Sequence, residues 1–566
     1  MKPVYFSVLV IILLCSLAVC SGPGSDTSGS ADPRPNVLLI VVDDLAFNDL
    51  GLFGSEIRTP NIDALAREGV FLTNFHVSPN CSPTRAMLFS GADSHNSGLG
   101  NMFEDLAPNQ KDNPGYEGYL NFRVAALSEL FLEAGYNTYM AGKWHLGLTR
   151  ETSPAARGFE RSFAPLQGGA GAFGNMLPIV GPGKALYRVN GEQLDTLPED
   201  FYSTKFYTDL MQEYIGADLD DGKPFFAYLA YTSPHWPLQA PQESIARYKG
   251  VYDAGYDALA EQRLQNLKDR GLVDAGIEPY PRLLDERPWD ELGPEEQRYQ
   301  AKIMEIYAAM VDDVDVYIGR MIDYLKEIGE YDNTVIFFMS DNGPEGHAMQ
   351  HSFVEVAEWA EVCCDNSYEN IGNADSYVWL GPNWARAGNT PLRMFKGYTG
   401  QGGVRAPAFF HYPRAMQTAV MNDSIVTVKD VMPTLLELAG IEHPGPGTFQ
   451  GREVIAMEGR SVVPVLTGAS ASIREPGDYM GWELFGKQAI RQGDWKILYV
   501  PSIPSRDARL PVLEPGQWQL YNLADDPAEM NDLARSNPEK LREMLALWEQ
   551  YTQEINFIYP DTLTGY

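Results

Sequence analysis

The chain has 566 residues, of which 44% are hydrophobic and 21% charged, and this suits a folded protein with one large domain and a smaller one. Its 76 acidic and 43 basic residues give a formal net charge of -33, which argues against nucleic acid and anionic membrane surfaces as partners because both would repel it. A site for an anionic substrate must therefore supply its own positive charge.

The N-terminus has the composition of an export signal. Lys2 precedes an apolar run over residues 4–20, which is too short for a comfortable spanning helix. Residues 17–20 are similar to a bacterial lipoprotein processing box, in which Cys20 would be lipidated; plain cleavage and an uncleaved anchor are the alternatives. Residues 21–35 predict a flexible linker. We expect export to the periplasm or cell envelope of a bacterium, with a lipid anchor as the only membrane contact.

Three apolar, β-branched segments predict strands that are buried on both faces, at residues 36–42, 225–231 and 334–340. Helical patterns at residues 124–134 and 310–328 lie between them or next to them. This alternation predicts an α/β fold with a large, mixed, mostly parallel sheet sandwiched between helices. Ligands of such sheets bind beyond the carboxyl ends of the strands, where polar residues cluster in this sequence.

The character of the sequence changes near Gly440. Before it, residues 240–300 are charged and helix-prone and predict an insertion over the core. After it, short strand patterns at 495–499 and 518–521 and a helical pattern at 538–554 predict a smaller α+β domain with a short antiparallel sheet. The predicted division is an export signal at 1–20, a linker at 21–35, a catalytic domain at 36–440 and a C-terminal domain at 441–566.

The five cysteines do not form a disulfide framework. Cys15 and Cys20 lie in the export segment, and Cys363 and Cys364 are adjacent. We expect the adjacent pair to be structural, or at most a strained vicinal pair. For an exported protein, this leaves Cys81 as an isolated thiol.

The segment around Cys81 carries the strongest signal of the sequence. Cys81-Ser82-Pro83-Thr84-Arg85, followed by Ser90-Gly91, resembles the maturation motif of the type I sulfatases, Cys-x-Pro-x-Arg with a downstream Ser/Thr-Gly. The resemblance implies that a maturase oxidises Cys81 to formylglycine (3-oxoalanine). In the hydrated aldehyde, one hydroxyl would attack sulfur to form a covalent sulfo-enzyme, and the other would expel sulfate.

Two pairs of oxygen-bearing side chains predict a metal site. Asp43-Asp44 and Asp341-Asn342 each follow a predicted strand, and such ligands suit calcium or magnesium. An Asp at a strand end often only caps a helix, but two such pairs together with Cys81 favour a metal. By the resemblance, one Ca²⁺ would be held by these four residues and Cys81.

Basic residues in four segments would supply the positive charge that a site for an anionic substrate needs in this acidic chain. Arg85, Lys143, His145, His235 and Lys396 lie in segments that resemble matching sulfatase segments. The resemblance implies that Arg85 orients the nucleophile and that Lys143 and Lys396 bind sulfate oxygens. His235, with Lys396, would assist the leaving oxygen. His145 would be the base that releases sulfate.

The resemblance spans residues 36–440 and is closest to bacterial arylsulfatases of the alkaline phosphatase-like superfamily, through residues 365–384. It implies hydrolysis of sulfate esters, most readily aryl sulfates, with a small-molecule or carbohydrate ester as substrate and the maturase as a transient partner. One alternative is a phosphonate monoester or phosphodiester hydrolase that uses the same site. A more remote one is an inactive calcium-binding envelope protein.

His347 and His351 have the spacing of residues on one helix face, but without a third ligand they are a weak metal signal.

Overall fold

The computed structural model describes residues 34–502 and 515–563. The predicted export signal, with Cys15 and Cys20, and nearly all of the predicted linker lie outside the described residues. Among the residues that are described, no helix is both long and apolar enough to span a membrane.

A ten-stranded mixed sheet forms the centre of the described structure, in the order β11-β2-β10-β9-β1-β8-β4-β5-β6-β7. Strands β9, β1, β8, β4 and β5 are parallel, and β10, β6 and β7 run antiparallel to their neighbours. The strands are β1 Asn36–Val42, β2 Val70–Leu72, β4 Asn137–Gly142, β5 Arg161–Pro165, β6 Tyr187–Val189, β7 Glu192–Leu194, β8 Phe225–Ala230, β9 Thr334–Ser340, β10 Ala408–His411 and β11 Val420–Asn422. The predicted α/β fold is confirmed.

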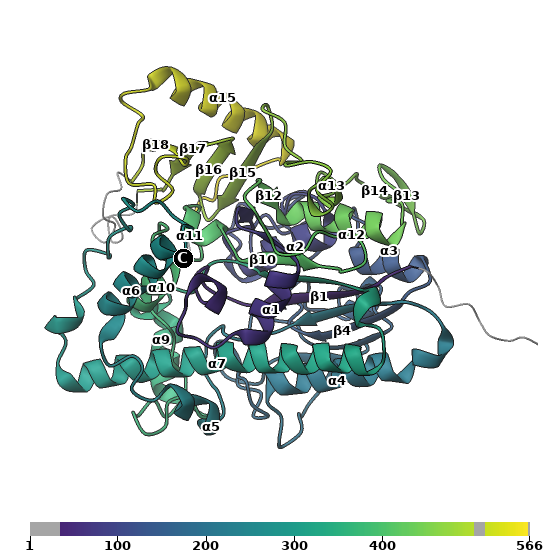
Figure 1. The fold of residues 1–566 in the computed structure, drawn as a ribbon, viewed down its shortest axis with the longest axis horizontal. Helices are drawn as coiled ribbons and strands as arrows, with labels where there is room; N and C mark the ends of the chain where they lie inside the picture. The colour runs from purple at the N-terminus through teal and green to yellow at the C-terminus, as the bar shows by residue number, and fades with distance from the viewer. Residues whose placement is uncertain (1–33, 503–514, 564–566) are drawn as a thin grey trace, which may run out of the picture.

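Helices cover both faces of this sheet because alternate residues of its strands face opposite cores. Leu38 and Ile40 of β1 belong to one hydrophobic cluster, and Val37 and Leu39 belong to the other. The first face carries α1 Pro60–Glu68, α4 Ser203–Ala217, α6 Gly255–Asp269, α7 Pro294–Glu327 and α10 Pro382–Asn389, and the second carries α2 Cys81–Ser90, α3 Leu127–Glu133 and α12 Val431–Ala439. Figure 1 shows α7 running the length of the larger part, beside α4.

The predicted helix at 310–328 and the predicted insertion at 240–300 need correction. Helix α7 begins at Pro294, with proline in its first turn followed by Glu295 and Glu296, which are strong helix-start signals. Tyr248 and Tyr252, within the predicted insertion, are buried in the core of the first face. This segment therefore contributes to the core and does not only cover it.

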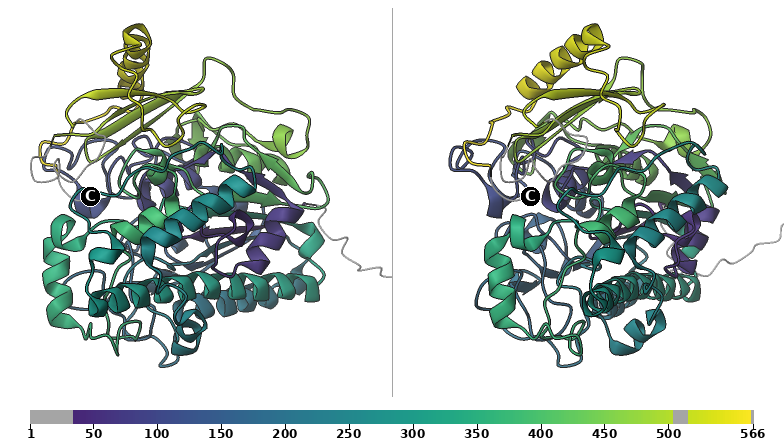
Figure 2. Two further views of the ribbon diagram at one scale, coloured as in Figure 1. Left: turned by 60° about the vertical axis from the view of Figure 1, so that its left-hand side comes forward. Right: turned by 90° about the vertical axis from the view of Figure 1, so that its left-hand side faces the viewer.

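A second sheet of four antiparallel strands packs beside the first. It contains β15 Tyr479–Leu484, β16 Lys487–Gln492, β17 Trp495–Tyr499 and β18 Trp518–Asn522, and it is followed by α15 Pro538–Glu554. Ile497 faces α15, whereas the next residue, Leu498, faces the main core. Figure 2 shows this sheet lying between α15 and the larger part. The boundary near residue 440 stays a prediction; Phe449 and Leu466, beyond it, pack in the core of the α2 face.

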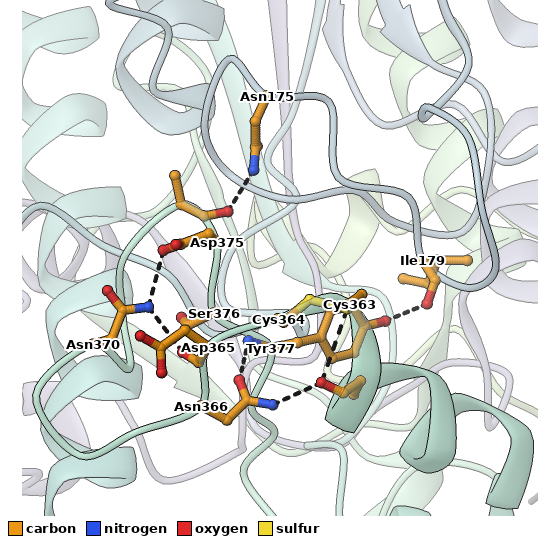
Figure 3. The surroundings of a disulfide bond; sticks show 12 residues. Asn175, Ile179, Cys363, Cys364, Asp365, Asn366, Asn370, Asp375, Ser376 and Tyr377 are labelled. Carbon is orange, nitrogen blue, oxygen red and sulfur yellow. Dashed lines mark hydrogen bonds between the residues drawn. A yellow bond between two sulfur atoms is a disulfide. The ribbon is translucent and has the colours of Figure 1, made fainter.

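Cys363 and Cys364 form a disulfide at the end of α9 (Val354–Cys363), as Figure 3 shows. The adjacent cysteines are therefore a vicinal disulfide pair, which was one of the two expectations from the sequence. Beside it, Asn366 Nδ2 donates to the carbonyl of Ala360 over 3.0 Å, and Asn366 Oδ1 accepts from the amide of Tyr377 over 2.6 Å. Asn366 thus ties the last turn of α9 to the loop that follows the disulfide.

We predict that the double variant Cys363→Ser/Cys364→Ser is almost as stable as the unaltered chain. A bridge between adjacent residues closes the smallest loop that a chain can form, so it removes only about 1 kcal/mol of unfolded-state entropy. Thermal unfolding should shift by less than about 2 °C. As a contrast, Ile40→Ala in the core should cost about 2–5 kcal/mol. A shift in the cysteine variant as large as that of Ile40→Ala would contradict this account.

Candidate active site

Four oxygen-bearing side chains meet where β1 and β9 end. Asp43 and Asp44 follow β1, and Asp341 and Asn342 follow β9, its parallel neighbour in register. Asn342 Nδ2 donates to Asp44 Oδ1 over 2.6 Å, and the amide of Asp44 donates to Asp341 Oδ1 over 3.3 Å. All four side chains are buried. The common edge of two parallel strands thus brings both sequence pairs together.

Cys81 is the first residue of α2 and lies against this acidic group. Asn80 caps the helix, its side-chain oxygen accepting from the amide of Cys81 over 2.7 Å. Cys81 Sγ lies 3.5 Å from Asp43 Oδ1, and burial raises the pKa of the thiol well above its usual value. An unmodified Cys81 would therefore be a protonated, poorly nucleophilic thiol.

Three predicted cations each pair with one of the three buried carboxylates. Lys143 Nζ lies 2.7 Å from Asp43 Oδ2, and Lys396 Nζ lies 2.9 Å from Asp44 Oδ1. The guanidinium of Arg85 lies 2.8 Å from Asp341 Oδ2 and also donates to the carbonyl of Lys143. Arg85 therefore sits beneath Cys81 and fixes Asp341 in place.

The two aspartates after β1 respond differently to burial. Burial raises the pKa of Asp43, but Lys143, Arg85 and Lys396 outweigh it, and the pKa ends below its usual value. For Asp44, burial dominates over the attraction of Lys396, and neighbouring carboxylates add to it, so the pKa rises to about 7. The three carboxylates thus carry no more negative charge than Lys143, Lys396 and Arg85 neutralise.

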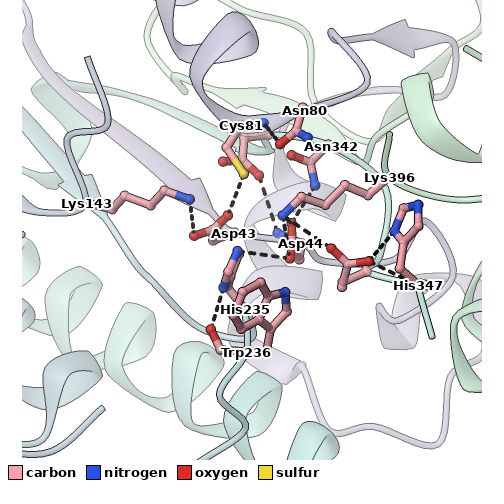
Figure 4. A network of polar contacts seen from close by, with 12 residues as sticks. Asp43, Asp44, Asn80, Cys81, Lys143, His235, Trp236, Asn342, His347 and Lys396 are labelled. Atoms are coloured by element: carbon pink, nitrogen blue, oxygen red, sulfur yellow. Dashed lines mark hydrogen bonds and ion pairs between the residues drawn. The ribbon is translucent and has the colours of Figure 1, made fainter. Parts of the chain in front are cut away.

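His235 follows β8 and lies close to Asp44 (Figure 4). Its Nδ1 is 2.6 Å from the carbonyl oxygen of Trp236, and its Nε2 is 3.7 Å from Asp44 Oδ2. Because a carbonyl only accepts, Nδ1 carries the hydrogen of the neutral ring and Nε2 has none to donate. Burial, with Lys396 and Lys143 nearby, lowers the pKa of His235 well below its usual value.

His145 has a partner that the sequence did not reveal. Its Nε2 lies 2.9 Å from Oε1 of Glu104, a residue of the short 3₁₀ helix Phe103–Asp105. Burial lowers the pKa of His145, while Glu104 opposes that effect. Gly168 leaves room for this pair, since a Cβ there would lie 2.9 Å from His145 Cε1. No local pattern marks Glu104, because its loop reaches His145 only in the folded chain.

Glu345 is a second residue that sequence reasoning missed. It lies 3.8 Å from Lys396 Nζ through Oε2 and 2.5 Å from His347 Nδ1 through Oε1. His347 precedes the short helix α8 (Met349–Ser352) that contains His351, so the two histidines do not share a helix face as expected from their spacing. His347 is buried against Glu345, whereas His351 is exposed.

The donor set fits a hard divalent cation. Asp43, Asp44, Cys81 and His235 each offer a ligand atom within 4.8 Å of the others. Asn342 Oδ1 is buried without a hydrogen-bond partner, an acceptor that a cation would satisfy. Carboxylate and amide oxygens favour calcium or magnesium over softer metals.

A cavity of about 760 Å³ opens above this centre. Asn80, Cys81, His145, His235 and Lys396 lie at its base. The remaining lining residues come mostly from loops, the 3₁₀ helix Phe103–Asp105 and α9, and most of them are apolar. The structure thus joins a compact charged base to a wide apolar chamber.

A mixed sheet with an acidic, cation-lined centre at its carboxyl edge defines a hydrolase of the alkaline phosphatase-like superfamily. Residues 35–441 match the family model Sulfatase, and residues 395–555 match N-sulphoglucosamine sulphohydrolase, C-terminal. The chain therefore belongs to the sulfatase family, whose members hydrolyse sulfate esters.

Known proteins resemble the chain over most of its length. An uncharacterized sulfatase of Schizosaccharomyces pombe is 44% identical over 538 residues, covering 93% of this chain and 94% of the relative. An arylsulfatase of Klebsiella aerogenes is 39% identical over 414 residues, covering 72% and 87%. The solved structure of Ps i-CgsB in complex with k-i-k-neocarrahexaose has a TM-score of 0.64 at 25% identity, covering 93% and 94%.

We predict that Glu104→Gln weakens catalysis through His145. The amide keeps the size but loses the charge that orients His145, so kcat should fall about 3- to 10-fold. Because Glu104 raises the pKa of His145, its loss should also move the acidic limb of the kcat profile to lower pH. Glu358→Gln, exposed on α9, is the matched control. An unchanged pH profile and kcat would rule out this role for Glu104.

We predict that calcium stabilises the folded chain. After treatment with a chelator, adding calcium to about a hundred times its Kd should raise the unfolding free energy by about 2.7 kcal/mol and restore activity. Asp44→Asn should abolish the rise in melting temperature, and Asp365→Asn, an exposed acidic residue elsewhere, should preserve it. Full activity and an unchanged melting temperature after chelation would refute the metal site.

Proposed function

We propose that the chain hydrolyses aryl sulfates with a formylglycine made from Cys81 as nucleophile and one Ca²⁺ as cofactor. The observation that carries the proposal is the place of Cys81: it is the one cysteine outside a disulfide among the described residues, and it lies buried against Asp43 at the base of the cavity. When present, the hydrated aldehyde supplies a hydroxyl nucleophile and the calcium ion supplies a positive charge for the sulfate oxygens.

The residues around Cys81 each have a role in the proposed reaction. Lys143 and Lys396 are fully buried and held on aspartates, so their ammonium groups are fixed where sulfate oxygens would develop charge. Arg85 holds Asp341, which would accept a proton from the nucleophile. Asp43, Asp44, Asp341 and Asn342 would hold the cation. His145 would take the proton that accompanies release of sulfate, because its depressed pKa keeps it neutral.

Two observations support an aryl leaving group. His235 is neutral and has no hydrogen on Nε2, so it gives little acid assistance to the leaving oxygen unless the bound sulfate raises its pKa. A phenolic oxygen needs less protonation than an alkyl oxygen, because a phenol is the stronger acid. Trp236 and Phe353 in the cavity walls also suit an aromatic ring.

The proposal also covers how Cys81 is converted to formylglycine and where the protein is located. A maturase would have to read residues 81–91 before folding, since Cys81 and the whole of α2 are buried in the folded chain. The composition of residues 1–20 supports export to the cell envelope, where a lipid on Cys20 would be the membrane anchor.

We predict that the peptide containing Cys81 is about 18 Da lighter than its cysteine form and that the same preparation releases sulfate from nitrophenyl sulfate. Cys81→Ala should lower turnover to the level of the buffer, because alanine cannot be oxidised to formylglycine. Co-expression of a maturase controls for a host that lacks one. Formylglycine without turnover of sulfate, but with turnover of a phosphonate monoester, would favour that alternative.

A further inference from the structure

The cavity is much larger than a single aromatic ring requires. A cavity of about 150 Å³ holds benzene, and the cavity above Cys81 has about 760 Å³. Its base, with Lys396, His145 and His235, takes the sulfate group. Most of the volume is therefore left for the alcohol part of the ester.

The mouth of the cavity carries an apolar ring that is open to water. Phe103, Val180 and Val354 are 55%, 46% and 48% exposed, although large apolar side chains are usually covered. They come from three separate segments: the 3₁₀ helix at 103–105, the loop before β6, and the first turn of α9. Convergence of three segments on one opening points to a ligand that covers them.

Below this ring the walls stay apolar. Met102, Trp236 and Phe353 line the cavity between the mouth and the base, and the first two are buried. A ligand that fills the chamber thus exchanges water for apolar contact along its whole depth. Each additional buried ring strengthens binding in proportion to its apolar area.

The acidic residues that line the cavity come from two of the segments that carry the apolar ring. Glu104, Asp105 and Glu355 line the cavity, whereas its basic lining residues among those described, Lys396, His145 and His235, lie at the base. Glu104 keeps its charge beside the neutral ring of His145, whereas burial followed by repulsion from Glu104 raises the pKa of Asp105 to about 7. Glu355, exposed in the first turn of α9, is thus an acidic lining residue that takes no part in the pair with His145. A second anionic group on the ligand would be repelled there.

We propose that the ester joins one sulfate to an uncharged, apolar phenol of two or more fused rings, with Phe103, Val180 and Val354 selecting its size and Glu355 rejecting a second anion. This inference rests on the proposed function. It assigns the selectivity of the site to residues of the mouth, which take no part in the chemistry at Cys81.

The test compares kcat/KM of the matured full chain for three aryl sulfates whose phenols have similar acidity: nitrophenyl sulfate, methylumbelliferyl sulfate, and the carboxymethyl analogue of the latter. The fused-ring ester should exceed the single-ring ester by about 10-fold, because it buries more apolar area. The carboxylated analogue should fall about 10-fold below its neutral counterpart, and added salt should narrow that gap.

Two variants on α9 test whether Val354 causes the preference for the fused ring and Glu355 causes the rejection of the carboxylated ester. Val354→Ser should reduce the fused-ring preference about 3-fold, and Glu355→Gln should raise the relative rate of the carboxylated ester about 3-fold. Val362→Ser and Glu358→Gln, exposed on the same helix but outside the cavity, are matched controls that should change neither ratio.

Turnover of nitrophenyl sulfate with no preference for the fused ring, or with equal rates for the neutral and carboxylated esters, overturns this inference and leaves the proposed function standing. Absence of turnover of all three esters by protein that carries formylglycine overturns both.

Discussion

The active site depends on one constraint: three carboxylates, Asp43, Asp44 and Asp341, are buried together at one edge of a parallel sheet. Buried charges are strongly destabilising unless each has a partner. The partners Lys143, Lys396 and Arg85 come from the end of β4, the loop before β10 and helix α2. Neutralising the edge of the sheet therefore fixes distant parts of the chain around Cys81.

The same constraint prepares the site for an anion and a cation. Lys143 and Lys396 are buried and paired with aspartates, so little rearrangement would be needed for the proposed binding of sulfate oxygens. Burial raises the pKa of Asp44 to about 7 and Asn342 Oδ1 is buried without a hydrogen-bond partner, so a further positive charge would stabilise both groups. A calcium ion would supply that charge in a strongly acidic protein.

Chemistry and selectivity are assigned to different parts of the fold. The base of the cavity comes mainly from strand ends and the start of α2, which are rigid because both faces of the sheet are covered. The walls come from loops and α9, where side chains vary without disturbing the core. The second sheet also reaches these walls, since Leu484 at the end of β15 and Phe485 in the turn after it pack with Met102 and Phe353.

The sequence by itself determined the strands at 36–42 and 334–340, the α/β fold and the residues at their carboxyl ends, because buried parallel strands have a continuous apolar pattern and ligands bind at one edge. It also singled out Cys81 through a local motif. Only the tertiary structure decided that Glu104 pairs with His145, that Glu345 lies beside Lys396, and that Phe103, Val180 and Val354 surround one opening. Those contacts join residues far apart in the chain, and no local periodicity or spacing encodes a distance of that kind.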